Sequence, residues 1–419
     1  MRVNDLAPLR WPAWVWLAGL SVIFIIRFPI LFMSHPPFLM DFDVYRAVSV
    51  RILGGGAAAL YDPTSTDVMM FKYAPVWALA WIPLAWCSPQ AGAILWSLKT
   101  VAWLILAAAG SRLLCHKAGV PAPAWTAVAV VSLLVRSITG EFLNGQVDIL
   151  WGLFVIGFLL GDVFRRPWWA ALSLALAISL KVPALIFIPY LLLRRRTALA
   201  AQTLGLFVAL NALTCLALEP SRPFHLIGAW ANVLRSSGPA RAFEIGNQSL
   251  LALAGRFLSA DGYRLNVLSL SHRGVFLAML LVFAALFALV VCTTPSRPKE
   301  PACSLFDGAL LTILMVLGSP TVWTATYSAL VFPVALAIAC AATRPRATWL
   351  DPLSALAALA VVVLSVFTHS YFWHAIGVRF FRSESYVFLV LMALPWMGLA
   401  LFLYLWRQRR LLLREPRPA

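Results

Sequence analysis

Apolar segments long enough to cross a bilayer recur along this chain, and they constrain its fold more than any other feature. A transmembrane helix needs about 20 apolar residues. Hydrophobic residues make up 62% of the 419 residues and charged residues 12%, which excludes a soluble domain and a disordered chain. We therefore predict an all-α polytopic membrane protein with about 10–13 transmembrane helices. The apolar segments are 13–33, 74–87, 90–111, 121–138, 149–164, 168–193, 198–218, 275–293, 305–318, 321–342, 349–367 and 386–406.

Arginine clusters beside the apolar segments predict how the chain is oriented. Positively charged loops stay in the cytoplasm, which places Arg165–Arg166, Arg194–Arg196 and Arg407–Arg414 there. No small-x-small cleavage site follows Trp11–Met33, so we expect a retained first helix that starts inside. We expect one membrane domain over residues 1–419, in a bacterial inner membrane, with its active site facing the periplasm. Its outer loops are predicted at 34–72, 219–274 and 368–385.

The charge balance and the metal-binding residue types exclude other classes. The net charge is +17, which in a soluble protein would indicate nucleic acid. Here the cations lie at the ends of apolar runs, so membrane lipids are the expected partner and nucleic acid is not. The six Cys contain no C-x-x-C pair and the six His no H-x-x-x-H spacing. We therefore predict no disulfide framework, no metal site and no cofactor.

One apolar segment carries a lysine and a proline in its middle. Proline breaks a helix and a lysine at the bilayer centre is costly, so Lys181 and Pro183 predict two half-helices that meet there. We expect Lys181 to face a cavity and to compensate an anionic group. The short segment 74–87 crosses the membrane, lies in the interface or re-enters.

Two carboxylates follow the first apolar segment. Asp41 and Asp43 lie near the expected headgroup plane, in a chain with few acidic residues. A partly desolvated carboxylate there can act as a general base on a hydroxyl group. Aspartate is also common in solvated loops and helix caps, so that interpretation stays open.

Cations of the outer loops are candidates for phosphate binding. Lys72 lies at the outer end of an apolar segment, where its ammonium could meet a lipid phosphate or extend to the interface. Arg256 belongs to an arginine-rich loop. Arginine contacts phosphate with two hydrogen bonds, although general attraction to anionic lipids accounts for such arginines equally well.

A polar stretch between two apolar runs is a candidate for sugar binding. Glu141, Asn144 and Gln146 offer more hydrogen-bonding groups than helix capping requires. Such groups bind sugar hydroxyls in cavities. Asn-Gly also forms turns, and a simple turn is the alternative interpretation.

Six motifs occur in a fixed order between about residues 40 and 340. They are Asp41-x-x-Val44-Tyr45 with Leu60-Tyr61-Asp62, Tyr73-Ala74-Pro75, Asn144-Gly145-Gln146, Leu180-Lys181-Val182-Pro183, Asn247-Gln248-Ser249-Leu250 with Arg256, and Gly318-Ser319-Pro320 with Trp323. Together they resemble the polyprenol-phosphate-mannose-dependent mannosyltransferases of the GT-C class, glycosyltransferase family eighty-seven.

The resemblance implies inverting transfer of a hexose, mannose in the family, from a polyprenyl-phosphate carrier to a hydroxyl of a lipid or glycan acceptor. It implies Asp41 as the general base, with Asp43 as the fallback, and Lys72 beside the donor phosphate. The substrate-binding residues that it implies are Tyr45, Lys72, Tyr73, Glu141, Asn144, Gln146, Lys181, Asn247, Gln248, Ser249, Arg256 and Trp323.

One departure from the family pattern keeps other functions open. The family often carries histidine two or three residues after the motif tryptophan, where this chain has Ala325 and Thr326. A transporter or flippase of a lipid-linked sugar is the main alternative, although it would favour internal symmetry, which we do not see. A non-catalytic subunit of an envelope-synthesis complex is the third.

Overall fold

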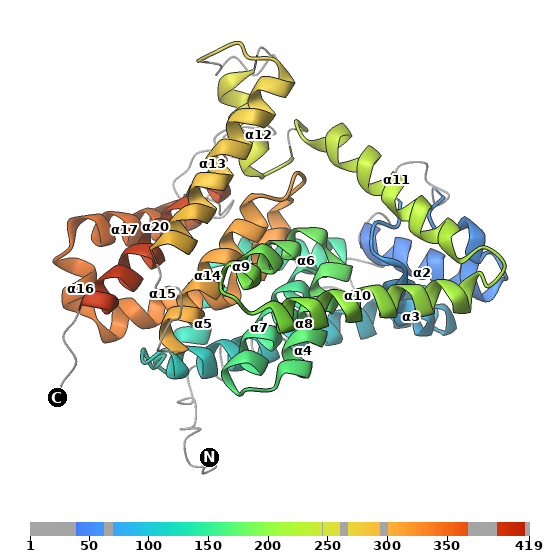
Figure 1. Cartoon of the computed structure of the whole chain (residues 1–419), viewed down its shortest axis with the longest axis horizontal. Helices are drawn as coiled ribbons and strands as arrows, with labels where there is room; N and C mark the ends of the chain where they lie inside the picture. The colour runs from blue at the N-terminus through green and yellow to red at the C-terminus, as the bar shows by residue number, and fades with distance from the viewer. Residues whose placement is uncertain are drawn as a thin grey trace.

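The computed structural model describes residues 39–62, 70–244, 246–259, 267–293, 301–367 and 392–414, and these ranges are mostly helical (Figure 1). They contain no named strand, and one isolated bridge joins Ser259 and Leu270. The predicted all-α class is therefore confirmed. The first apolar segment, 13–33, and the predicted outer loop 368–385 lie outside the described residues.

The described helices follow one another with short connections; η denotes a 3-10 helix. Those up to the predicted break are α2 (Met40–Leu53), η2 (Ala57–Ala59), α3 (Pro75–Trp81), η3 (Ile82–Trp86), α4 (Pro89–Lys117), α5 (Thr126–Leu133), α6 (Val135–Asn144), α7 (Asp148–Val163) and α8 (Pro167–Leu180). Those after it are η4 (Val182–Ile186), α9 (Phe187–Leu193), α10 (Thr197–Leu218), α11 (Pro223–Arg241), α12 (Leu250–Leu258), α13 (His272–Cys292), α14 (Pro301–Leu317), η5 (Thr324–Leu330), α15 (Val331–Thr343), α16 (Pro345–Trp349), α17 (Pro352–Phe367) and α20 (Ala393–Arg414).

Several of these helices have the length and composition of membrane spans. Four described helices qualify, namely α4, α10, α13 and the continuous η5–α15. The pair α5 and α6 would make a fifth span, bent by 68°. Five apolar helices of 10–17 residues accompany them, among them the short segment Pro75–Trp86. A multi-pass membrane protein is confirmed, and the count of about 10–13 spans remains a prediction.

The helix break at Lys181 is where the sequence predicts it. α8 ends at Leu180, Lys181 takes an extended conformation with φ −145° and ψ 119°, and η4 follows. Pro183 has no backbone N–H to continue the hydrogen-bond ladder, which explains why the helix does not continue. The two half-helices therefore meet at a lysine whose side chain is 24% exposed.

A tight hairpin of α7 and α8 carries this break. An added Cβ at Gly161 would lie 2.6 Å from the backbone nitrogen of Ala170, so glycine permits this close packing. The antiparallel pair places Asp148 and Lys181 at one end and the turn Arg165–Arg166 at the other. The 16 residues of α7 separate the two ends by about 24 Å.

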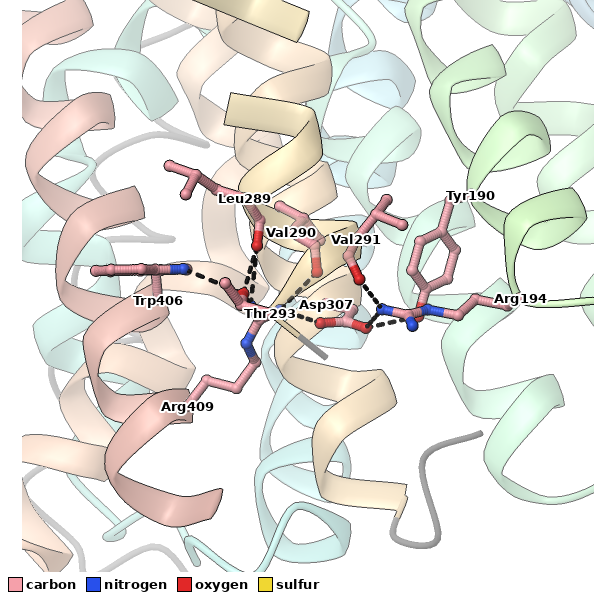
Figure 2. A network of polar contacts seen from close by, with 9 residues as sticks. All are labelled: Tyr190, Arg194, Leu289, Val290, Val291, Thr293, Asp307, Trp406 and Arg409. Atoms are coloured by element: carbon pink, nitrogen blue, oxygen red, sulfur yellow. Dashed lines mark hydrogen bonds and ion pairs between the residues drawn. The ribbon is translucent and has the colours of Figure 1, made fainter. Parts of the chain in front are cut away.

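A buried ionic network centred on Asp307 of α14 joins four helices (Figure 2). Arg409 of α20 contacts its carboxylate, and Arg194 at the end of α9 contacts it at 3.3 Å. The hydroxyl of Tyr190 donates a hydrogen bond to the same carboxylate at 2.8 Å. Figure 2 shows the two guanidinium groups on opposite sides of Asp307.

The same two arginines hold the C-terminal end of α13. The last carbonyl groups of a helix lack partners within it and carry partial negative charge. Arg194 donates to the carbonyl of Val291 at 3.2 Å, and Arg409 donates to the carbonyl of Leu289 at 3.3 Å. The network therefore fixes α9, α13, α14 and α20 against one another.

Replacing Asp307 with Asn should strongly destabilise the folded protein. The variant leaves two buried guanidinium groups without their counter-ion, which costs about 3 kcal/mol or more. The measurement is the thermal midpoint of the purified protein. Asp351→Asn is the matched control, because Asp351 pairs with Arg407 of the same α20 at 2.7 Å nearer the surface. Equal shifts in the two variants would contradict the central role of the network.

Candidate functional site

A cavity of about 1110 Å³ lies at the end of the α7–α8 hairpin that carries Asp148 and Lys181. The N-terminal turn of α2, the helix break, η5 and inward faces of α11, α13 and α14 line it. Eight predicted site residues line it together: Asp41, Tyr45, Lys72, Tyr73, Asn144, Gln146, Lys181 and Trp323. Six do not: Asp43, Glu141, Asn247, Gln248, Ser249 and Arg256.

Packing of α2 onto the loop after α6 directs Asp41 into this cavity. Gly145 has φ +69°, and an added Cβ there would lie 2.8 Å from the Cβ of Phe42. The chain before α2 is held as well, because the Leu39 N–H donates to the Leu143 carbonyl at 2.9 Å. Glycine in the Asn-Gly-Gln motif thus lets the first turn of α2 lie directly on it. Asp43, two residues on, faces away and is exposed.

The environment of Asp41 suits a carboxylate that exchanges protons. Burial raises its pKa to about 6, and the positive charge of Lys181 and a hydrogen bond from Gln146 partly oppose that rise. Asp148 raises the pKa of Asp41 further, whereas Lys72 lowers it. A carboxyl group with such a pKa is mostly ionised at neutral pH yet binds a proton readily, as a general base requires.

Two tyrosines continue the polar wall from Asp41. Tyr45 lies one helical turn after Asp41 on the same face of α2, and its hydroxyl is 2.7 Å from the hydroxyl of Tyr73. The hydroxyl of Tyr61 donates to the Tyr73 carbonyl at 2.9 Å, which holds that segment in place. Stacking on Trp81 fixes the Tyr45 ring. The two phenol groups therefore present a rigid hydrogen-bonding pair to the cavity.

Three cations line the cavity in addition to the tyrosines. Lys72 is held through its backbone, because the indole N–H of Trp230 donates to its carbonyl at 3.0 Å. Burial and the nearby Arg241 lower the pKa of Lys72. Arg241 at the end of α11 lies 3.8 Å from Glu244. No sequence pattern singles out Arg241, because it is one of many arginines in a loop and no spacing distinguishes it.

Lys181 reaches the cavity from the helix break and pairs with Asp148, the first residue of α7. Asp148 is fully buried, and its second carboxylate oxygen has no hydrogen-bond partner among the described residues. Sequence reasoning placed Asp148 only near a segment end. The signal that could have found it is its place two residues after Gln146, directly before an apolar run.

Asn247 joins two loops behind the cavity wall. Its side-chain amide donates to the carbonyls of Arg241, Ala242 and Pro320 at 2.8–3.0 Å. Its side-chain oxygen accepts from the backbone N–H groups of Ser249 at 2.9 Å and Val322 at 3.0 Å. Both neighbouring loops contribute residues to the cavity, so Asn247 sets their relative position.

The other predicted residues outside the cavity also bind protein groups. Ser249 caps α12 through Ala252, and the Gln248 N–H donates to the Val322 carbonyl at 2.6 Å. Arg256 is 2% exposed and donates to the Asn247 carbonyl at 3.3 Å. Glu141 accepts hydrogen bonds at 3.0 Å from the Ile149 N–H and from the Ser328 hydroxyl.

The wall around Trp323 completes the site. Its ring packs against Gly246, where an added Cβ would lie 2.7 Å from it. Ala325 and Thr326 also line the cavity, and the Trp323 N–H donates to the Thr326 hydroxyl at 3.2 Å. Among the described residues, no group of three or more His, Cys, Asp or Glu side chains could hold a metal ion.

Comparison with known proteins identifies the family. Residues 71–320 match the sequence profile of Glycosyltransferase family 87, which is more than half of the chain. The chain belongs to this family. The resemblance inferred from the motifs is therefore confirmed, and the match covers the cavity residues from Lys72 to Pro320.

Two relatives of this glycosyltransferase family 87 member carry the same description, polyprenol-phosphate-mannose-dependent alpha-(1-2)-phosphatidylinositol mannoside mannosyltransferase. The Mycobacterium tuberculosis protein is 30% identical over 205 residues, which are 43% of this chain and 45% of the relative. The match thus spans less than half of that relative. The Mycolicibacterium smegmatis protein is 27% identical over 357 residues, 80% of this chain and 77% of the relative.

A solved structure shows a looser likeness to this family 87 chain. It is ArnT from Cupriavidus metallidurans bound to undecaprenyl phosphate, with a TM-score of 0.41 and 14% sequence identity. The alignment covers 95% of this chain and 77% of ArnT.

Replacing Asn247 with Ala should lower stability more than substrate affinity. The change removes the hydrogen bonds between two loops and strands buried backbone groups, which costs about 2 kcal/mol. We expect a lower thermal midpoint, measured on the purified protein. A variant with the wild-type midpoint and a raised KM for the donor would instead support direct substrate binding by Asn247.

Proposed function

We propose that this chain transfers a hexose, mannose by analogy with its relatives, from a polyprenyl-phosphate carrier to a hydroxyl of a lipid or glycan acceptor. The observation that carries the proposal is the partly desolvated carboxylate of Asp41 in one cavity with Lys72, Lys181 and Arg241. The relatives' descriptions name polyprenol-phosphate-mannose as donor and phosphatidylinositol mannoside as acceptor.

The donor fits the cavity by its two chemical parts. The cations offer charge-assisted hydrogen bonds to its phosphate, which carries developing negative charge as the glycosidic bond breaks. The apolar wall suits the polyprenyl tail; it consists of Val182, Leu185, Ile186, Pro189, Phe283, Phe287, Leu314 and Met315. Because α13 is 11% buried over its span, the tail can continue from the cavity into lipid.

Asp41 performs the proton transfer in this proposal. The acceptor hydroxyl approaches the anomeric carbon on the face opposite the phosphate, and Asp41 accepts its proton as the new glycosidic bond forms. The configuration at the anomeric carbon is then inverted. Phosphate is a good leaving group once its charge is compensated, so positioning and electrostatics supply most of the acceleration. Tyr45, Tyr73, Asn144 and Gln146 offer hydrogen bonds to sugar hydroxyls.

The charge distribution supports a periplasmic site in a bacterial inner membrane. Arg165 and Arg166 lie at the hairpin end opposite the cavity, and positively charged loops stay in the cytoplasm. The cavity then opens on the outer side. A flippase would move the lipid-linked sugar without forming a glycosidic bond, and a non-catalytic subunit would leave labelled donor unchanged.

Replacing Asp41 with Asn should reduce transfer at least about 100-fold, because the amide cannot accept the proton. The assay incubates purified protein with labelled polyprenyl-phosphate mannose and membrane extract and identifies the product by mass. Asp43→Asn is the matched control and should keep near-wild-type activity, because Asp43 is exposed outside the cavity. Unchanged transfer by the Asp41 variant would refute the assignment, and loss only in the Asp43 variant would move the base to Asp43.

Transfer should fall as the pH drops below the pKa of Asp41. Only the ionised carboxylate accepts a proton, and burial raises this pKa to about 6. We therefore expect kcat/KM to be constant near neutral pH, to reach half its maximum near pH 6, and to fall about tenfold per unit below that. A pH–rate profile at saturating acceptor measures this. A half-maximum near pH 4, where an unburied aspartate titrates, would contradict it.

A further inference from the structure

Two turns at the hairpin end opposite the cavity share one conformation. Phe164-Arg165-Arg166 connects α7 to α8, and Arg194-Arg195-Arg196 connects α9 to α10. The middle arginine is left-handed in both, with φ 55° at Arg165 and φ 57° at Arg195. Each turn closes with the same pair of backbone hydrogen bonds to the preceding helix, the pattern of a helix that ends on a left-handed residue.

This position ordinarily belongs to glycine, and the chain uses glycine in equivalent places. The left-handed glycines are Gly55, Gly119 and Gly145. Gly119 ends α4 with the same bonding, donating to the His116 carbonyl at 3.1 Å. An L-residue is strained in this conformation. The other left-handed non-glycine residues described, Leu39 and Met392, are fully buried, whereas Arg165 and Arg195 are exposed. The two arginine side chains thus serve a purpose outside the protein core.

The two turns lie side by side. Arg196 of one turn donates to the carboxylate of Asp162 beside the other at 2.6 Å. Lys117 at the end of α4 joins them, with its ammonium 5.3 Å from the ring centre of Phe164. Asp162 is the single acidic residue in the segments 112–120, 162–169 and 194–198, and Arg196 compensates its charge.

Exposed tryptophans flank these cations. Trp168 and Trp169 in the first turn of α8 are 63% and 66% exposed. We call the whole group the basic turn surface; it comprises Lys117, Arg165, Arg166, Trp168, Trp169 and Arg195. Exposed tryptophan beside arginine, at the ends of apolar helices, is typical of the boundary between hydrocarbon and headgroups.

We propose that the basic turn surface binds the phosphate groups of anionic phospholipids in the leaflet opposite the cavity. Arginine pairs with phosphate oxygens through two hydrogen bonds, and each cation near an anionic leaflet gains electrostatic attraction. The left-handed turn projects each middle arginine outward from the hairpin end, which explains why strain is accepted there. A soluble anion would have no use for the two tryptophans, so the occupant is a lipid headgroup.

The test compares the full-length wild type with the double variant Arg165→Gly, Arg195→Gly in nanodiscs. The discs contain phosphatidylcholine alone or with phosphatidylglycerol, and the readout is the thermal midpoint. The wild-type midpoint should rise with phosphatidylglycerol, and high salt should reduce that rise. The double variant should match or exceed the wild type in phosphatidylcholine, because glycine relieves the strained φ, and should lose most of the rise.

Two controls distinguish headgroup binding at the basic turn surface from a general effect of charge and from binding of a soluble phosphate. Arg222→Gln changes an exposed arginine after α10, at the end opposite the basic turn surface, and should keep the whole rise. Soluble glycerol 3-phosphate should give the wild type no rise in phosphatidylcholine. The proposal is overturned if the double variant keeps the wild-type rise, if its midpoint falls in phosphatidylcholine, if Arg222→Gln loses as much, or if glycerol 3-phosphate reproduces the rise. Neither glycosyl transfer nor the role of Asp41 enters this measurement.

Discussion

The ion pair between Lys181 and Asp148 is the contact on which the cavity depends. A lysine is tolerated at a break between half-helices only with a compensating partner and access to water. Asp148 supplies the partner from the first turn of α7, where a negative charge is also favoured by the helix dipole. The pair therefore fixes the ends of α7 and α8 together, and its two charges act in opposite directions on the pKa of Asp41.

Around this pair, residues that face the cavity are supported by residues that bind only protein. Asp41 and Tyr45 reach the cavity because α2 lies on Gly145, and Lys72 because Trp230 holds its backbone. Asn247 and the network around Asp307 position loops and helices that contribute to the wall without lining it themselves (Figure 2). A motif residue shared by a family can thus be important for either reason, and only the packing distinguishes them.

The two ends of the α7–α8 hairpin differ in charge and in exposure. One end holds a partly desolvated carboxylate with three cations in a cavity, and the other holds exposed arginines beside tryptophans. This asymmetry orients the protein in a bilayer, and it also separates two kinds of phosphate recognition. The cavity offers phosphate-binding groups in a shielded site, whereas the basic turn surface meets the headgroups of bulk lipid.

The sequence by itself determined the helical membrane class, the break at Lys181 and Pro183, the family, and Asp41 as the candidate base. These follow from local facts: apolar length, a missing N–H, and scarce carboxylates. Tertiary structure decided which face of α2 meets the cavity, and so separated Asp41 from Asp43, because two residues along a helix turn the side chain through about 200°. It also placed Asp148 and Arg241 in or beside the site and moved Asn247, Gln248, Ser249 and Arg256 behind its wall. Those positions depend on contacts between segments far apart in the chain, which no local pattern encodes.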